Sequence, residues 1–258
     1  MADGDPRFQT KRREIGADGE LAWGGDGESW RDAVSESSGV SVSNQDGIEP
    51  EIIVPDSAVA HFNVQNLIGY SDGDTVSTWP NKVGADATGQ ATYRVNGING
   101  YASIEFDGIS DEFAADVGVY SQVNTIIAVV ELAGSDNHTI VAERDGAATD
   151  RNNLQYTTGK WNMFAGKSIY GSEEPTRQLI TSVVDGANTV IREDGRQTVS
   201  GDAGTEGLNG VRIGYMEEIG GRYWDGEIGL VEIHDGLPSN GLQTRENEIA
   251  TEWGISTA

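Results

Sequence analysis

The chain of 258 residues contains no cysteine, only four lysines and no long run of apolar residues. Without cysteine no disulfide can stabilise the fold, and cysteine usage gives no information about the redox compartment. A membrane-spanning helix needs about 20 consecutive apolar residues, so the sequence predicts no membrane insertion. The segment that follows the basic residues near the amino terminus is too polar for a signal peptide, so we expect no export by that route.

Positive charge is scarce, whereas acidic residues are abundant. The chain has 42 acidic residues against 17 basic ones, and its net charge is −25. A monomer with this charge repels itself unless salt screens it. Because the acids are dispersed and lysine is rare, we favour a halophilic protein; the alternative is an ordinary acidic extracellular or viral protein. The body of the chain has no basic stripe, which argues against nucleic acid as a partner.

The first 50 residues differ from the rest of the chain. They are polar, rich in glycine, serine and aspartate, and show no β alternation. A segment of this composition does not bury enough apolar surface to fold alone. It is either a disordered tail or an irregular assembly arm that orders against other proteins or copies of the same chain. Its two tryptophans favour the arm. The candidate contact residues of the arm are Arg12, Arg13, Leu21, Trp23 and Trp30.

Residues 51–258 consist of short apolar runs separated by turn residues. Pairs such as Asp107-Gly108 and Asp185-Gly186 tolerate positive φ and close tight turns between strands. Regular spacing of such runs predicts an all-β domain, built as a two-sheet antiparallel sandwich. The run GEIGLVEIH (226–234) is the last interior strand of this prediction.

A short helix is expected behind that last strand. Leu242, Ile249 and Trp253 follow one another at spacings of seven and four, which places them in one stripe on a helix. Ser239 is the candidate amino-terminal cap and Gly254 the expected stop. The stripe is expected to lie across the end of the sandwich.

Three segments carry a resemblance to a known family. They are SDGDTVSTWPNKVG (71–84), NGINGYASIEFDGISDEF (96–113) and YWDGEIGLVEIHDGLPSNGLQTRENEIATEWGI (223–255). In this order they resemble the concanavalin A-like lectin/glucanase superfamily, in particular the laminin-G-like modules of phage and bacterial surface proteins. The resemblance implies a jelly-roll of two antiparallel sheets. It does not imply one function, because the same fold carries lectins, glycosidases, adhesion modules and spacers.

The chain departs from the superfamily at several positions. Ala102 stands where proline is usual, and Asn81 stands where aspartate is usual. The glucanase branch carries E-x-D-x-x-E on one strand, so that its carboxylates share a face. Here Glu105 and Asp107 match, but Ser110 replaces the last carboxylate. We therefore predict that the protein is not an enzyme, and a glycoside hydrolase is the least favoured reading.

Calcium is the one cofactor that the sequence brings into question. The loop ERDGAATDRNN (143–153) offers oxygen ligands from Asp145, Asp150 and Asn152. The alternative is that these are solvated loop residues of an acidic protein. No other cofactor is expected, since the three histidines show no metal-binding spacing.

Aromatic residues near a predicted hairpin are the candidate sugar contacts. The hairpin NLQYTTGKWNMFAG (153–166) contains Tyr156, Trp161 and Phe164, and Tyr170 follows it. Exposed aromatic rings stack on sugar faces, so we name Tyr156, Trp161 and Tyr170 as glycan-binding candidates. The alternative is that some of these rings belong to the core.

These features together favour a virion structural or decoration protein of a halophilic virus, such as a capsid turret or a tail-fibre component. Such a protein assembles in the host cytoplasm, and its lectin-like domain would face outward toward host surface glycans. The alternative is a secreted or cell-surface adhesion module that binds glycans.

Overall fold

The computed structural model describes residues 13–15, 21–23, 54–134, 137–145, 151–217 and 221–257. The chain divides into two compact units, Met1–Ile53 and Val54–Ala258. In the first unit, β1 (Arg13–Ile15) pairs antiparallel with β2 (Leu21–Trp23). Two short strands therefore occur where the sequence predicted an irregular arm. Arg12 and Trp30 lie outside the described residues, and the assembly role of residues 1–50 stays a prediction.

The described part of the second unit is a sheet of 15 strands in which every pairing is antiparallel, and it confirms the predicted all-β class. The strands are β3 (Ala58–Asn63), β4 (Thr75–Trp79), β5 (Ala87–Arg94), β6 (Ser103–Asp107), β7 (Glu112–Tyr120), β8 (Asn124–Leu132), β9 (His138–Ala142), β10 (Asn152–Thr157), β11 (Lys160–Ala165), β12 (Ser168–Tyr170), β13 (Leu179–Val184), β14 (Thr189–Glu193), β15 (Arg196–Gly201), β16 (Leu208–Ile213) and β17 (Asp225–Asp235). Short 3-10 helices are η2 (Val64–Asn66), η3 (Ile98–Gly100) and η4 (Gly186–Asn188).

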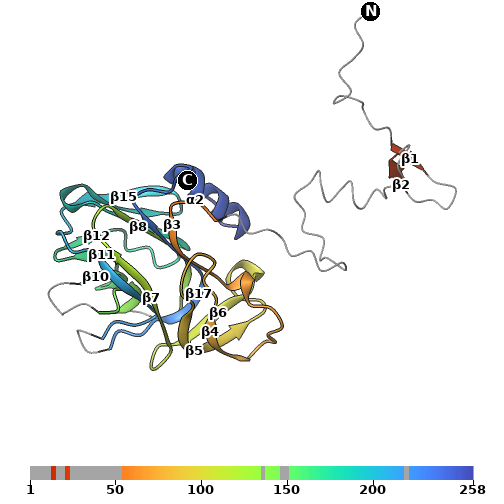
Figure 1. The fold of residues 1–258 in the computed structure, drawn as a ribbon, viewed down its shortest axis with the longest axis horizontal. Helices are drawn as coiled ribbons and strands as arrows, with labels where there is room; N and C mark the ends of the chain where they lie inside the picture. The colour runs from red at the N-terminus through yellow and green to blue at the C-terminus, as the bar shows by residue number, and fades with distance from the viewer. Residues whose placement is uncertain are drawn as a thin grey trace, which may run out of the picture. The chain divides into compact units, whose positions relative to one another are not determined.

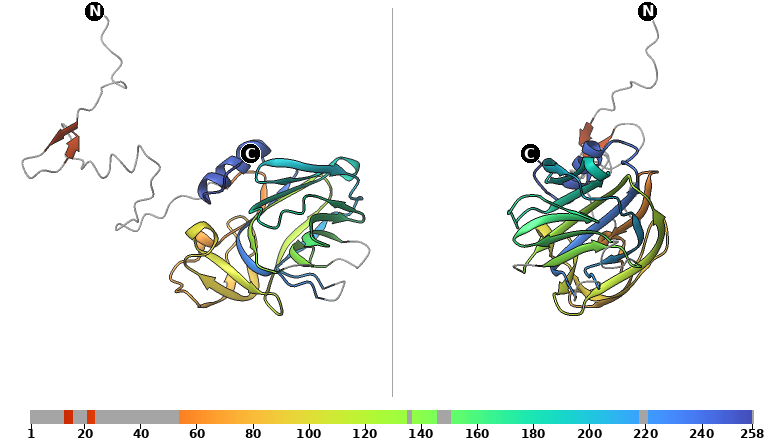
Figure 2. Two further views of the ribbon diagram at one scale, coloured as in Figure 1. Left: turned by 180° about the vertical axis from the view of Figure 1, so that it is seen from behind. Right: turned by 90° about the vertical axis from the view of Figure 1, so that its left-hand side faces the viewer.

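The two predicted layers are parts of one curved sheet. Its strand order is β12-β11-β10-β9-β16-β7-β5-β6-β17-β8-β13-β14-β15, with β3 added to β17 and β4 added to β5. The long strand β17 makes this continuity possible, because its first half pairs with β6 and its second half with β3. The end strands β12 and β15 lie close together, so the sheet is nearly closed (Figure 1, Figure 2).

The core lies between the two halves of this sheet. Four tryptophans, Trp79, Trp161, Trp224 and Trp253, are fully buried. Trp161 stacks on Trp224 with 6.5 Å between ring centroids, and Trp79 meets Phe113 edge-on at 5.7 Å. Large rings in these geometries supply much of the apolar burial that a chain without disulfides needs.

Helix α2 (Leu242–Glu252) confirms the predicted short carboxy-terminal helix and lies beside β3 and β15 (Figure 1). Ile249 and Trp253 are fully buried, as the stripe predicted. The ring of Trp253 covers Gly229, where an added Cβ would lie only 2.3 Å from it. The predicted cap was wrong: Gly241 precedes the helix, while the Ser239 backbone amide donates to Ser57 Oγ at 2.8 Å. None of the helices in the described residues is long and apolar enough to cross a membrane.

An ionic network anchors this helix to the sheet. Arg245 of α2 donates to both carboxylate oxygens of Glu232 at 2.9 and 2.7 Å. His61 Nδ1 and His234 Nε2 lie 2.7 and 2.6 Å from the same carboxylate. Glu232 and both histidines are fully buried, so the network lies between β3, β17 and the helix. These contacts fix the first half of α2. The buried Ile249 and a hydrogen bond from Asn63 Nδ2 to Glu252 at 2.9 Å hold its second half.

Candidate functional site

Two of the three predicted sugar-stacking residues belong to the core. Tyr156 and Trp161 are directly opposite each other on β10 and β11, are 4% and 0% exposed, and meet edge-on at 5.0 Å. Trp161 Nε1 also donates to the carbonyl of Glu174 at 2.8 Å. Neither ring presents a face to a ligand, so this part of the prediction was wrong. Tyr170 is 44% exposed and keeps its place as a candidate.

The opposite face of the same hairpin is polar. Because side chains alternate along a strand, Asn153, Gln155 and Thr157 of β10 point away from the core. Asn162 and Phe164 of β11 lie directly opposite Gln155 and Asn153. These five residues form the amide face. All of them except the half-buried Phe164 are buried, although they lie on the outer side of the sheet.

Hydrogen bonds orient the amides of this face. Gln155 Nε2 donates to Asn162 Oδ1 at 2.6 Å, and Asn162 Nδ2 donates to the carbonyl of Ile169 at 2.8 Å. Arg222 Nη1 donates to Gln155 Oε1 at 2.8 Å and to Thr157 Oγ1 at 3.2 Å. The side chains of Gln155 and Asn162 are therefore held in defined orientations by partners on three different segments.

Part of the amide face lacks hydrogen-bond partners within the described residues. Both polar atoms of Asn153, Oδ1 and Nδ2, are buried without a partner, and so is Thr139 Oγ1 on β9. Thr139 lies directly opposite Gln155, on the same face of the sheet. Buried polar groups are nearly always bonded to protein, water or ligand. Asn153 and Thr139 thus keep hydrogen-bonding capacity that a water molecule or a ligand can take up.

The face continues across the neighbouring strands in one row. Asn153 lies opposite Ala142 of β9, and Ala142 lies opposite Arg212 of β16. Arg212 lies 5.6 Å from the ring centroid of Tyr215, which stacks on Tyr223 at 4.4 Å. Burial, followed by the neighbouring Tyr223, raises the pKa of Tyr215 to about 12, so its phenol stays neutral at physiological pH. The half-buried rings of Tyr215 and Tyr223 therefore lie at the β16 end of this row, away from Phe164 on β11.

The predicted calcium ligands do not form a ligand set within the described residues. The Asp145 carboxylate accepts from Arg144 Nε at 2.9 Å, and this hydrogen bond lowers the pKa of Asp145. Asn152 is buried on β10, and its Nδ2 donates to the carbonyl of Glu206 at 3.3 Å. Asp150 lies outside the described part of the chain. No group of three His, Asp or Glu side chains in that part could hold a metal ion.

The run that resembles the glucanase motif begins on β6 and ends in a turn. Asp107 Oδ1 accepts from the backbone amides of Ile109 and Ser110, both at 2.8 Å. Although burial raises the pKa of Asp107, these amides and the Ser110 hydroxyl lower it overall. Asp107 therefore stabilises the turn after β6, and Ser110 belongs to this turn.

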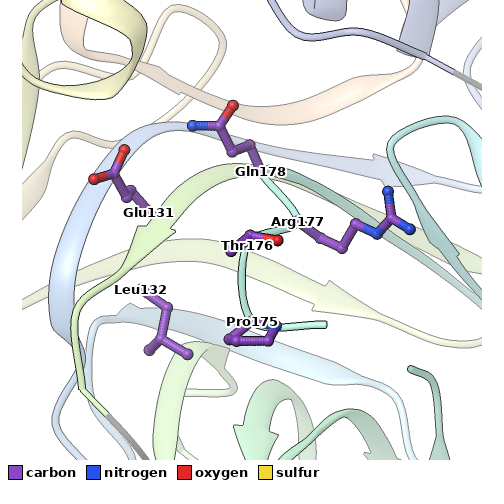
Figure 3. Close-up of a pocket in the computed structure, with 6 residues that line it drawn as sticks. All are labelled: Glu131, Leu132, Pro175, Thr176, Arg177 and Gln178. Carbon is purple, nitrogen blue, oxygen red and sulfur yellow. The ribbon is translucent and has the colours of Figure 1, made fainter. Parts of the chain in front are cut away.

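A row of glutamates crosses three strands near a pocket that the sequence did not predict. Glu227 of β17 lies opposite Glu105 of β6 and Glu131 of β8. Burial and then the charges of Glu131 and Glu105 raise the pKa of Glu227, while a hydrogen bond from Ser103 opposes the rise. The pocket holds about 330 Å³ (Figure 3). Its lining residues are Glu131, Leu132, Pro175, Thr176, Arg177 and Gln178.

The orientation of the lining residues limits what this pocket offers. The side chains of Glu131 and Gln178 extend toward the same side, whereas Arg177 points away from them (Figure 3). Arg177 Nη1 donates to Asp194 at 3.2 Å, and Gln178 Oε1 accepts from Asn99 Nδ2 at 2.9 Å. Arg177 and Gln178 thus each hold a partner outside the pocket, although Arg177 Nε is buried without a partner among the described residues.

No family model matches the chain, and no curated protein matches it. Among solved structures, the chain is similar to domain 4 of AbnA, a GH43 extracellular arabinanase from Geobacillus stearothermophilus, in complex with arabinotriose. That match has 14% identity and a TM-score of 0.49, and it covers 75% of this chain and 99% of that one.

A mutant of Trypanosoma rangeli sialidase with trans-sialidase activity matches with 13% identity and a TM-score of 0.50. The match covers 78% of this chain and 34% of that one, so the chain spans about a third of the sialidase. This similarity concerns the fold alone. The second unit therefore shares a β fold found in a glycan-active enzyme, and membership of the concanavalin A-like superfamily stays a prediction.

Proposed function

We propose that the second unit is a non-catalytic glycan-binding module and that the amide face is its binding surface. The observation that carries the proposal is the amide network on the outer side of β10 and β11, which includes the unsatisfied carboxamide of Asn153. A carboxamide both donates and accepts hydrogen bonds, as a sugar hydroxyl does. Aromatic rings beside such groups supply apolar area for the faces of sugar rings.

The test is binding of the full-length chain to a glycan array, followed by calorimetric titration of the best ligand. Arg222→Ala removes the guanidinium that orients Gln155, and we expect it to weaken binding about tenfold. Gln197→Ala, on exposed β15, is the matched control and should bind as the wild type does. Retention of full affinity by Arg222→Ala, with a ligand bound elsewhere, would contradict the assignment of this face.

The amide face suits a virion decoration protein and a surface adhesion module equally well, so the location of the protein stays a prediction from the sequence. We also propose that residues 1–50 form the assembly element. Deleting residues 1–45 should leave a folded, glycan-binding body that no longer assembles with copies of itself, as measured by light scattering. Unchanged assembly after the deletion would place the interface on the body instead.

A further inference from the structure

The ring of Phe164 is covered by one arginine. Arg151 Cζ lies 3.9 Å from the centroid of this ring. Phe164 lies directly opposite Asn153, and residues opposite each other in an antiparallel pair point to the same side of the sheet. The Arg151 guanidinium therefore lies on the outer side of the amide face, above the ring that neighbours the unsatisfied carboxamide. Phe164 is half-buried, whereas Asn153 has no exposed surface.

The position of Asn153 combines two unusual properties. Its carboxamide is buried with both polar atoms unpaired among the described residues, an arrangement that costs stability. A donor and an acceptor side by side match two adjacent hydroxyls of a sugar, one accepting from Nδ2 and one donating to Oδ1. The ring of Phe164, directly opposite on β11, offers a surface on which the same sugar ring can stack.

We propose that Arg151 covers a sugar subsite made by Phe164 and Asn153. When the guanidinium swings aside, a sugar ring stacks on Phe164, and two vicinal hydroxyls satisfy the Asn153 carboxamide. The ligand class is a neutral glycan with a free vicinal diol, because the two groups that would contact it, the Asn153 carboxamide and the Phe164 ring, are uncharged. This inference rests on the proposed function and adds the subsite, its cover and its ligand class.

Two variants separate binding from folding at this subsite. Asn153→Leu keeps the volume of the side chain but removes both polar atoms. Because those atoms are unsatisfied, the melting temperature should stay the same or rise, whereas glycan affinity should fall at least about tenfold. Arg151→Ala removes the cover, and we expect it to tighten binding several-fold. Gln197→Ala serves again as the control.

The probes are neutral trisaccharides of arabinose, xylose, glucose and mannose, with their O-methylated forms and a uronic acid trisaccharide as comparisons. The inference predicts binding of a neutral trisaccharide, loss on methylation, loss in Asn153→Leu and a gain in Arg151→Ala. If the wild type binds but both variants bind equally well, the subsite is refuted while the glycan-binding function stands. If the wild type binds nothing, Arg151→Ala is screened on the same probes. Binding by that variant alone supports the cover, and binding by neither protein overturns both proposals.

Discussion

Two regions on the outer side of the curved sheet, the one under helix α2 and the amide face, use polar residues in opposite ways. Under helix α2, a carboxylate and a guanidinium are closely paired: Glu232 accepts from Arg245 and lies within hydrogen-bonding distance of His61 and His234. Of the atoms in this network, His61 Nε2 is buried without a described partner. On the amide face the groups are neutral amides and hydroxyls, and the whole Asn153 carboxamide is unpaired within the described residues. An ionic network whose charges are paired fixes an element in place, whereas an unpaired neutral carboxamide remains available to a ligand.

The largest expected effect comes from removing the charge at the centre of the ionic network. Glu232→Ala leaves Arg245 buried without its main partner, and we expect a loss of about 3–5 kcal/mol in the free energy of unfolding. Glu248→Ala is the matched control, because Glu248 also pairs with Arg245 but its side chain is 44% exposed. It should cost about 1 kcal/mol or less. Denaturant unfolding measures both; similar losses would show that the buried network does not anchor α2.

Acid should weaken the same network. Burial alone would raise the pKa of Glu232, but hydrogen bonds from His234, His61 and Arg245 lower it far below its ordinary value. A group with a lowered pKa in the folded state stabilises the fold above its unfolded pKa, about 4.3 for glutamate. That stability is lost progressively as pH falls below this value. Between about pH 7, above that pKa, and about pH 3, below it, the free energy of unfolding should fall more steeply in the wild type than in Glu232→Gln.

Salt should separate stability from ligand binding. The net charge of −25 predicts that the melting temperature rises with KCl into the molar range, beyond ordinary screening. Binding through a neutral amide face should change little over the same range. A melting temperature that is flat between low and molar salt would remove the halophilic interpretation. A steep loss of glycan affinity with salt would instead indicate a charged binding surface.

The strands and the helix were readable from the sequence because their signals are local. The spacing of Ile249 and Trp253 predicted the buried stripe of α2. The alternation of side chains along the hairpin strands also showed which rings face the core, and the prediction of sugar-stacking residues did not use it. Tyr156 shares its side of β10 with the core residue Leu154, and Trp161 shares its side of β11 with Met163. This alternation alone assigns the two rings to the core and the amides to the outer face.

Other features of the molecule depend on pairings that no local pattern shows. The register that aligns Asn153 with Ala142 and then Arg212 joins the consecutive strands β9 and β10 to β16, which lies much further along the chain. Arg222 reaches Gln155 from 67 positions away. The continuity of the sheet through β17 arises in the same way, because the strand changes partners along its length. The two layers that the sequence predicted are therefore joined in the structure as two halves of one curved sheet.

The most direct test of the amide face as the glycan-binding surface follows the side-chain amides by NMR during titration with a neutral trisaccharide. We expect the side-chain NH2 resonances of Asn153, Gln155 and Asn162 to shift with one common affinity. The backbone amides of His61 and Glu232, under helix α2, should stay unchanged. Saturable shifts confined to the α2 side, or to the pocket at Glu131, would contradict the assignment of the amide face as the glycan-binding surface.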